Sequence, residues 1–295
     1  MPTADIHGII GYTVTPFDLE SDGLDLGALS RSIERLIAAG INAIAPLGST
    51  GEGAYLSDQE WQLVCKHSLN QVARRVPTIV SVSDLTTAST IRRAQYAQAH
   101  GADAVMVLPM SYWKLSPAEI RQHYQAIGDS IDIPIMLYNN PATSGTDMSV
   151  DLIMDIYRSV PNVTMVKEST GDIERMHRLR DLSQGRLPFY NGCNPLALEA
   201  FKAGAKGWCT AAPNLIPQQN IQLYQAVKNN DLPAAQQVFD RQLPLLQFIL
   251  KGGLPATIKA GLALTGLVVG DPRLPVFALA ENDQRQLWEL LNELR

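Results

Sequence analysis

Cysteine is scarce in this chain of 295 residues, and its three thiols, Cys65, Cys193 and Cys209, show no CxxC spacing. An odd number of widely separated cysteines indicates neither a disulfide framework nor a structural zinc site. The sequence therefore gives no sign of a small fold held together by covalent or metal cross-links.

Histidine is equally sparse, and its distribution argues against a metal enzyme. A metal-dependent aldolase or hydrolase would need His, Asp and Glu gathered at the ends of strands. The five histidines are scattered instead, at His7, His67, His100, His123 and His177. We therefore expect no metal site and no cofactor.

The chain also lacks an excess of basic residues and long apolar runs. Its 24 Lys and Arg against 29 Asp and Glu give a net charge of -5, which offers no footprint for nucleic acid or an anionic membrane. No stretch approaches the roughly 20 apolar residues that cross a bilayer. The N-terminal MPTADIHGII has neither the charged region nor the apolar core of a signal peptide. We expect a cytoplasmic protein whose partner is a small molecule.

What the chain does contain is a regular alternation of apolar strands and amphipathic helices. Strands are predicted at Ile6–Val14, Ala43–Leu47, Pro77–Val82, Ala104–Leu108, Ile133–Tyr138, Val163–Lys167, Leu187–Tyr190 and Gly207–Thr210. Helices are predicted at Leu24–Ala39, Ser57–Ala73, Thr87–Ala99, Pro117–Ile127, Val150–Arg158, Ile173–Leu182 and Pro195–Ala203. From Pro217 onward only helices follow, at Gln218–Asn229, Leu232–Leu250, Thr257–Leu267 and Asn282–Leu294.

Eight strand–helix units with strands apolar on both faces predict a parallel sheet closed into a (β/α)8 barrel. A doubly wound open sheet is the alternative, and the lack of GxGxxG after any strand weakens it. We assign residues 1–228 to the barrel, which carries the active site, and 229–295 to a helical extension packed on it. No low-complexity linker separates the two parts.

Lys167 is the strongest candidate for a catalytic residue. It closes the apolar run NVTMV and precedes the turn ESTGD. A buried ammonium is costly and tends to lose its proton, and the neutral amine can attack a carbonyl to form a Schiff base. The alternative is a lysine that reaches solvent or pairs with a carboxylate such as Glu168.

Three further motifs follow predicted strands, and in a barrel the carboxyl ends of the strands form the active-site face. The turn Gly48–Glu52 follows the second strand, Tyr138 closes the fifth and Gly192 follows the seventh. The turn offers backbone N–H groups and the hydroxyls of Ser49 and Thr50, which suit a carboxylate or a phosphate. A plain turn before a helix is the alternative.

Tyr138 suits a proton relay, because a phenol within reach of an imine can move protons in both directions. Its other interpretation is a core tyrosine with a satisfied hydroxyl. Cys193 and Cys209 also lie near the expected mouth, where small buried thiols commonly fill space. We include Cys209 among the candidate substrate-binding residues. A phosphate-binding barrel is not favoured, since the glycine-rich turn it needs after strand seven or eight is absent from the segment Gly192–Pro195.

Taken together, the motifs resemble the dihydrodipicolinate synthase / N-acetylneuraminate lyase family. They stand in order over essentially the whole chain: Thr15-Pro16-Phe17, GSTGE at Gly48–Glu52, Tyr112 after Pro109, YNNPATSG at Tyr138–Gly145, KESTGD at Lys167–Asp172, and Gly192. The resemblance implies a homotetrameric, metal-independent class I aldolase that forms a Schiff base with pyruvate. It adds Thr50 and a tyrosine from a neighbouring subunit to the relay of Tyr138. Tyr112 fits that tyrosine, although many relatives carry two adjacent tyrosines there.

The second substrate is where the chain departs from the best-known relatives. In dihydrodipicolinate synthases the motif YNxPxRTG supplies an arginine for the carboxylate of aspartate semialdehyde, whereas Thr143 stands at that position here. In sialic-acid lyases an acidic pair after the seventh strand contacts the sugar, and Asn194 and Pro195 replace it here. We therefore expect the enzyme to cleave or condense a different 2-oxo acid, such as a 2-keto-3-deoxy sugar acid whose hydroxyls Thr143, Ser144 and Asn194 contact. A genuine dihydrodipicolinate synthase and a catalytically silent 2-oxo-acid-binding barrel are the alternatives.

Overall fold

The computed structural model describes residues 5–294, so the first four residues of the N-terminal stretch considered above lie outside it. Within that range eight strands form one sheet in the order β2-β1-β8-β7-β6-β5-β4-β3. The strands are β1 (Gly8–Tyr12), β2 (Ala43–Ala45), β3 (Ile79–Ser81), β4 (Ala104–Val107), β5 (Ile135–Asn139), β6 (Val163–Glu168), β7 (Phe189–Asn191) and β8 (Gly207–Thr210). The fold is a (β/α)8 barrel with helices after β8, as the sequence predicts.

The helices of the barrel and of the C-terminal extension begin and end within a few residues of their predicted bounds. They are α1 (Leu26–Ala38), α2 (Asp58–Val72), α3 (Thr87–Ala99), α4 (Pro117–Gly128), α6 (Val150–Ser159), α7 (Ile173–Ser183), α8 (Ala197–Lys202), α9 (Pro217–Lys228), α10 (Leu232–Gly252), α11 (Leu254–Leu264) and α12 (Glu281–Asn292). The sequence did not predict the short helix α5 (Pro141–Ser144) or the 3-10 turns Gly53–Tyr55 and Ala212–Asn214. These three lie in loops, where apolar periodicity is too short to read. The predicted helix Pro195–Ala203 begins as the 3-10 turn Asn194–Leu196 before it continues as α8.

Capping residues explain why the starts of some helices can be predicted from the sequence. A capping box joins Ser57 to Glu60 at the start of α2, and a second one joins Ser116 to Glu119 at the start of α4. In each, the serine hydroxyl accepts a bond from the glutamate N–H and the glutamate side chain reaches back to the serine N–H.

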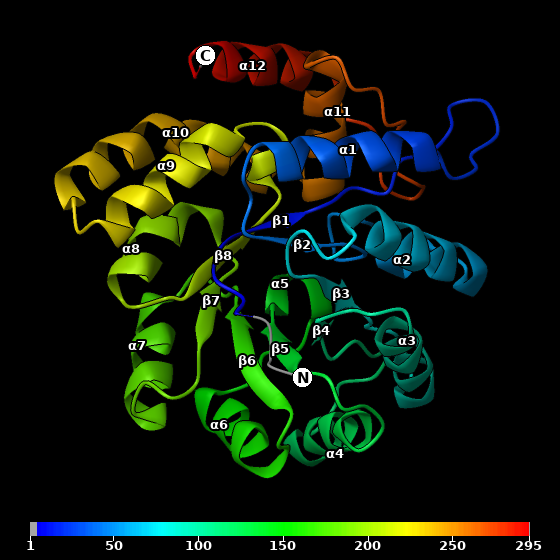
Figure 1. Ribbon diagram of the computed structural model, residues 1–295, viewed down its shortest axis with the longest axis vertical. Coiled ribbons are helices and arrows are strands. Elements are labelled where there is room, and N and C mark those ends of the chain that lie inside the picture. The colour runs from blue at the N-terminus through cyan, green and yellow to red at the C-terminus, as the bar shows by residue number, and fades with distance from the viewer. Residues whose placement is uncertain (1–4, 295) are drawn as a thin grey trace. The chain divides into compact units, whose positions relative to one another are not determined.

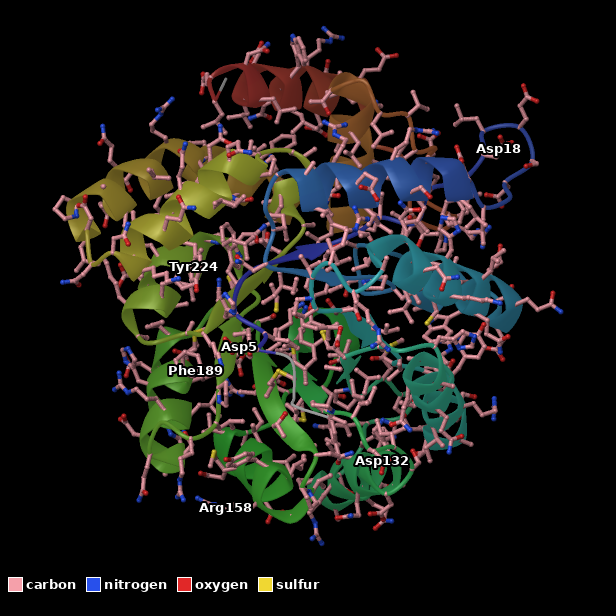
Figure 2. All side chains as sticks on the ribbon, viewed as in Figure 1. Asp5, Asp18, Asp132, Arg158, Phe189 and Tyr224 are labelled. Carbon is pink, nitrogen blue, oxygen red and sulfur yellow. The ribbon has the colours of Figure 1, made fainter. Side chains whose placement is uncertain are left out.

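Residue contacts divide the chain into two compact units. The first unit comprises the N-terminal segment up to His7 together with Pro77–Cys209. In it, β4 to β7 pair in parallel with their neighbours, and β5 is buried along its whole length. Helices α3, α4, α6, α7 and α8 lie outside these strands (Figure 1). Charged side chains of this unit, such as Asp132 and Arg158, lie on its outer surface (Figure 2).

The second unit comprises Gly8–Val76 and Thr210–Arg295. Here β1 pairs with β2 in parallel, and α9 packs extensively against α10. Asn214 Nδ2 donates to the carbonyl of Tyr12, which ties the segment after β8 to β1. The two units do not follow the predicted boundary between residues 1–228 and 229–295, which stays a prediction.

Candidate active site

Lys167 lies near the carboxyl end of β6, where its side chain is only 5% exposed. The sheet register pairs it with Tyr138 of β5, and its Nζ lies 3.9 Å from the centre of the Tyr138 ring. Side chains of paired residues on parallel strands point to the same face of the sheet. The structure thus brings together the two residues that the sequence marks as nucleophile and proton relay.

Glu168, the next residue along β6, faces away from Lys167 because successive side chains of a strand alternate. Its fully buried carboxylate accepts bonds from Arg175 Nε at 3.1 Å and from the Thr170 N–H at 2.8 Å. Asn139 Nδ2 donates to the same carboxylate at 3.2 Å. The Glu168 carboxylate, which the sequence left open as a partner for Lys167, is bound by these three groups.

Gly192 lies directly against the side chain of Lys167. A Cβ at this position would stand 2.7 Å from Lys167 Cε and 1.8 Å from Ser169 Oγ. Real Cβ atoms do not approach other atoms that closely, so the backbone after β7 leaves no room for a side chain. Glycine at position 192 is required by the placement of the lysine.

The loop after β5 orients the phenol of Tyr138. Asn140 Nδ2 donates to the Tyr138 hydroxyl oxygen at 2.7 Å, which leaves the phenolic proton available for another acceptor. The loop then forms α5, in which Thr143 is exposed and Ser144 is part-buried. Ser144 Oγ donates within the loop, so of these two hydroxyls that of Thr143 is the more open to solvent.

A partly buried ionic network anchors the far end of this loop. Arg175 of α7 contacts Asp147 at 3.3 Å and also donates to the carbonyl of Met148. Asn139 bridges the network, because its Nδ2 reaches Asp147 and its Oδ1 accepts from the Met148 N–H. The guanidinium of Arg175 is therefore committed to the loop and to Glu168.

Three other predicted residues of the first unit lie on different segments. Tyr112 is 86% exposed, and its ring meets Trp113 edge to face with the centroids 5.5 Å apart. Asn194 is buried at the start of its 3-10 turn, and Cys209 is buried on β8. Burial raises the pKa of Tyr190 on β7, with a smaller contribution from Cys209.

In the second unit, the turn Gly48–Glu52 after β2 is tightly constrained. It is flanked by Leu47 and Glu52, which both have left-handed backbones with φ of 65° and 53°. Gly51 and Gly53 have no space for a Cβ, since its nearest contacts would be backbone atoms of Leu47 at 2.9 and 2.2 Å. Thr15 Oγ1 donates to the carbonyl of Gly51 at 2.6 Å.

The predicted contact groups of this turn differ in exposure. Gly48 and Thr50 are buried, and Ser49 is part-buried. The turn therefore holds its hydroxyls and N–H groups in one conformation, as an anion-binding turn must.

Sequence reasoning missed a second buried lysine in the second unit. Lys259 of α11 is 2% exposed, and its Nζ lies 2.6 Å from a carboxylate oxygen of Glu52. Lys259 lies in the helical extension and not at a strand end, and a lysine within the apolar stretch PATIKAGLAL was the available signal for its burial. Burial alone therefore does not distinguish Lys167, whereas its place at a strand end does.

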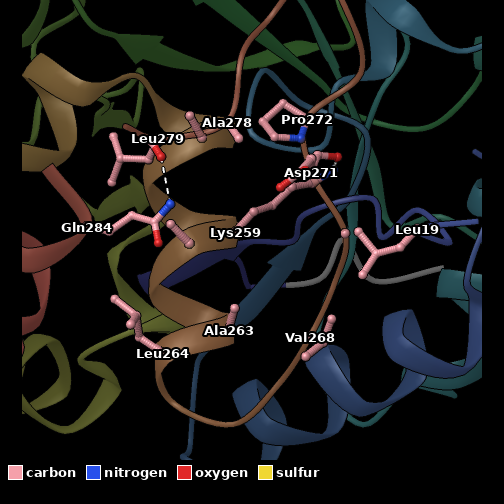
Figure 3. Close-up of a pocket in the computed structure, with 13 residues that line it drawn as sticks. Leu19, Lys259, Ala263, Leu264, Val268, Asp271, Pro272, Ala278, Leu279 and Gln284 are labelled. Carbon is pink, nitrogen blue, oxygen red and sulfur yellow. Dashed lines mark hydrogen bonds between the residues drawn. The ribbon is translucent and has the colours of Figure 1, made fainter. Parts of the chain in front are cut away.

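A cavity of about 340 Å³ lies in the second unit beside Lys259 (Figure 3). Its lining is mostly apolar and includes Ala263, Leu264 and Val268, with Gln284 donating to the carbonyl of Leu279 at its rim. The residues singled out from the sequence do not line it. We do not assign this cavity to the reaction.

The described residues also bear on other classes of protein. Across residues 5–294, no group of three or more His, Cys, Asp or Glu side chains is arranged to hold a metal ion. None of the helices in that range combines the length and apolar character that a membrane crossing needs.

Comparison with known proteins agrees with this geometry. Residues 5–294 match the model of the "Dihydrodipicolinate synthetase family". A 4-hydroxy-tetrahydrodipicolinate synthase of Methanospirillum hungatei is 30% identical over 288 residues, which cover 97% of this chain and 98% of the relative.

Solved structures show the same similarity. A provisionally assigned dihydrodipicolinate synthetase of Pseudomonas aeruginosa is 70% identical, covers 99% of this chain and 100% of its own, and superposes with a TM-score of 0.97. A chloride-inhibited dihydrodipicolinate synthase of Acinetobacter baumannii, solved with pyruvate, is 29% identical and covers 98% and 99%, with a TM-score of 0.94. Full-length similarity of sequence and fold means that this chain belongs to the dihydrodipicolinate synthetase family, a family of class I lyases that form a Schiff base with pyruvate.

Proposed function

We propose that Lys167 is the nucleophile that forms the Schiff base with pyruvate or a related 2-oxo acid. Its neutral amine attacks the keto carbon to give a carbinolamine, and loss of water then gives the imine. The observation that carries this proposal is the buried Nζ, held over the Tyr138 ring and confined by Gly192. This lysine also stands at the carboxyl end of a strand, the end at which barrel enzymes build their sites.

Tyr138 moves protons to and from the carbinolamine oxygen in this mechanism. The Asn140 amide donates to the phenol oxygen, so the phenolic hydrogen is free to point toward a reacting group. On the strength of the family resemblance we also assign Thr50, whose side chain is buried in the turn after β2, to the proton relay.

The turn after β2 binds the carboxylate of the 2-oxo acid. Its fixed N–H groups and the hydroxyls of Ser49 and Thr50 offer a preformed anion site without a cation. The pyruvate complex of the Acinetobacter relative supports pyruvate as the first substrate.

The second substrate is an aldehyde that lacks the carboxylate which an arginine at position 143 would bind. Thr143 cannot make the bidentate, charge-assisted contact of an arginine. Arg175 does not replace that arginine, because Glu168, Asp147 and the Met148 carbonyl already occupy its guanidinium. An exposed hydroxyl at 143 and a buried amide at Asn194 instead suit hydroxyl groups, as in a 2-keto-3-deoxy sugar acid.

A synthase that uses aspartate semialdehyde is the second candidate. The names of the relatives at about 30% identity favour it. The catalytically silent barrel is not retained, because the family consists of enzymes.

Two measurements test these proposals in sequence. Reduction of the pyruvate mixture with borohydride should leave one adduct per chain, on the peptide that contains Lys167, and Lys167→Ala should abolish it. An adduct on another lysine would overturn the assignment of the nucleophile.

A panel of aldehydes with pyruvate, and of 2-keto-3-deoxy acids in the cleavage direction, then tests the second substrate. Loss of a charged hydrogen-bonded pair costs roughly 2–5 kcal/mol, so aspartate semialdehyde should react at least about 30-fold less efficiently than the preferred aldehyde. Efficient condensation with the semialdehyde would show that the chain is a dihydrodipicolinate synthase.

The active assembly is a homotetramer built as a dimer of dimers, in which Tyr112 completes the relay of a neighbouring subunit. Its 86% exposure, and the 77% exposure of Trp113 beside it, place two large aromatic rings where a second copy can cover them.

A further inference from the structure

The C-terminal extension reaches back to the turn after β2 through a buried ion pair. Lys259 Nζ lies 2.6 Å from Glu52, and both side chains are almost completely inaccessible to solvent, at 1% and 0% exposure. The second carboxylate oxygen of Glu52 accepts the backbone N–H of Arg273 at 2.7 Å. A single glutamate at the end of the turn is therefore held from two points of the extension.

The conformation that this glutamate adopts needs such a hold. Glu52 has a left-handed backbone, with φ of 53°, which a residue with a side chain adopts only at a cost in free energy. Leu47, at the other end of the turn, has a φ of 65°. Strained residues persist only where their surroundings fix them, and at Glu52 the fixing groups are Lys259 and the Arg273 amide.

Phe17 lies at the centre of the same contacts and explains the motif Thr15-Pro16-Phe17. The Lys259 ammonium stands 4.1 Å from the centre of its ring and the Arg273 guanidinium 4.3 Å. Its backbone N–H donates to Val269 of the extension at 3.0 Å. Two residues earlier, Thr15 bonds to the Gly51 carbonyl inside the turn.

The Arg273 side chain adds further contacts between the C-terminal extension and the N-terminal part of the same unit. Its guanidinium pairs with Glu60 of α2 at 2.9 Å and donates to the carbonyl of Asp22 at 2.8 Å. Burial lowers the pKa of Lys259, and the Glu52 carboxylate beside it opposes that shift. The amine is thus engaged in fixing the turn, in contrast to the role proposed for Lys167.

We propose that Lys259 is a positioning residue that acts through Glu52 to hold the turn Gly48–Glu52 in the conformation that binds the carboxylate of the 2-oxo acid. The proposal rests on the proposed function only for the identity of the ligand. That the extension holds the turn can be tested without any substrate.

The first measurement is therefore amide hydrogen exchange in Lys259→Met. This variant keeps much of the apolar stem but leaves Glu52 buried without its cation. Exchange in peptides that cover residues 47–56 should become faster than in the parent protein. The double variant Lys259→Met with Glu52→Gln should exchange more slowly than Lys259→Met, because no uncompensated charge is left behind. Unchanged exchange in Lys259→Met would overturn the proposal, whatever the enzyme binds.

The second measurement separates binding from chemistry. In Lys259→Met the KM for pyruvate should rise about tenfold or more, while the yield of the reduced Lys167 adduct at saturating pyruvate stays within about twofold, because ground-state binding has been weakened. Leu246→Ala, at a fully buried position of α10, is the control for loss of stability alone. An equal rise in KM for Leu246→Ala would show that the higher KM of Lys259→Met comes from lost stability, and it would overturn the positioning role of Lys259.

The outcomes distinguish the two proposals. A looser turn with an unchanged KM for pyruvate would show that the extension holds the turn but that the carboxylate binds elsewhere. A looser turn with no adduct on Lys167 in the parent protein would remove the proposed nucleophile and leave the positioning of the turn intact.

Discussion

At the scale of single residues, the candidate site depends on what surrounds each chemical group. Lys167 and Glu168 are neighbours in sequence, yet alternation along β6 gives them opposite faces and separate partners. The lysine meets an aromatic ring, whereas the glutamate meets a guanidinium. One strand can therefore carry a reactive amine and a structural carboxylate side by side.

Gly192→Ala should remove activity while leaving the protein folded. The added methyl group would displace Lys167 Cε or Ser169 Oγ, and misplacement of a reacting group by about 1 Å can cost on the order of 100-fold in rate. Rates of borohydride trapping with pyruvate would measure the loss. Gly27→Ala is the matched control, since its Cβ would meet only side-chain atoms of Asp25 and Arg31, at 3.3 and 3.4 Å. Trapping at the parent rate in Gly192→Ala would refute the close approach.

His123 should make the folded state less stable in acid. Burial lowers its pKa from 6.5 to about 4, so between those values the unfolded chain binds a proton that the folded chain refuses. The free energy of unfolding should fall as pH drops from about 6.5 to about 4, by on the order of 3 kcal/mol, and the contribution should be flat outside that window. Urea unfolding across this range would measure the slope.

His123→Gln should flatten that slope. His177→Gln, at a part-buried position of α7, is the control for replacement of a histidine elsewhere. Equal slopes in the parent protein and His123→Gln would show that other groups cause the acid sensitivity.

At the scale of elements, ionic networks connect loops to helices far along the chain. Arg175 of α7 binds the loop that carries α5, and Lys259 of α11 binds the turn after β2. Both loops follow strands at the face where a barrel enzyme builds its site. The helices therefore do more than cover the sheet, because they also fix the loops that carry the candidate binding groups.

Arg175→Met should be strongly destabilising, because it leaves the fully buried Glu168 without its cation. Breaking a buried pair in this way costs about 3–5 kcal/mol. Arg178→Met lies one turn further along α7, where the pair with Asp151 is exposed, and should change stability by less than about 0.5 kcal/mol. Denaturant unfolding of both variants compares them directly, and similar losses would mean that burial of Glu168 is not the cause.

At the scale of the whole molecule, the exposure of Tyr112 connects activity to assembly. If Tyr112 serves a neighbouring site, then mixing inactive Lys167→Ala subunits with impaired Tyr112→Phe subunits should restore activity. In the hybrid, the site that keeps Lys167 receives an intact Tyr112 from its neighbour. Turnover before and after denaturation and joint refolding would measure the recovery. Failure to recover, with hybrids shown to form, would place Tyr112 in its own subunit's site or outside the reaction.

The sequence by itself determined the succession of strands and helices and the residues at the strand ends. The bounds of α3 and β8 match the predicted bounds, because apolar periodicity and terminal signals are local properties of the chain. The placement of Lys167 and Tyr138 on neighbouring strands also followed, since parallel strands joined by helices pair in order.

Only the tertiary structure decided which charges are buried and with whom. Lys259 and Glu52 are 207 positions apart, and no local pattern could pair them before α11 packed against the turn. From the sequence, Glu168 could have paired with Lys167 or with Arg175. In the structure its side chain points to the opposite face of β6 from that of Lys167 and pairs with Arg175. Solvation of a charge depends on every segment that packs around it, so its partners appear only when the whole chain has folded.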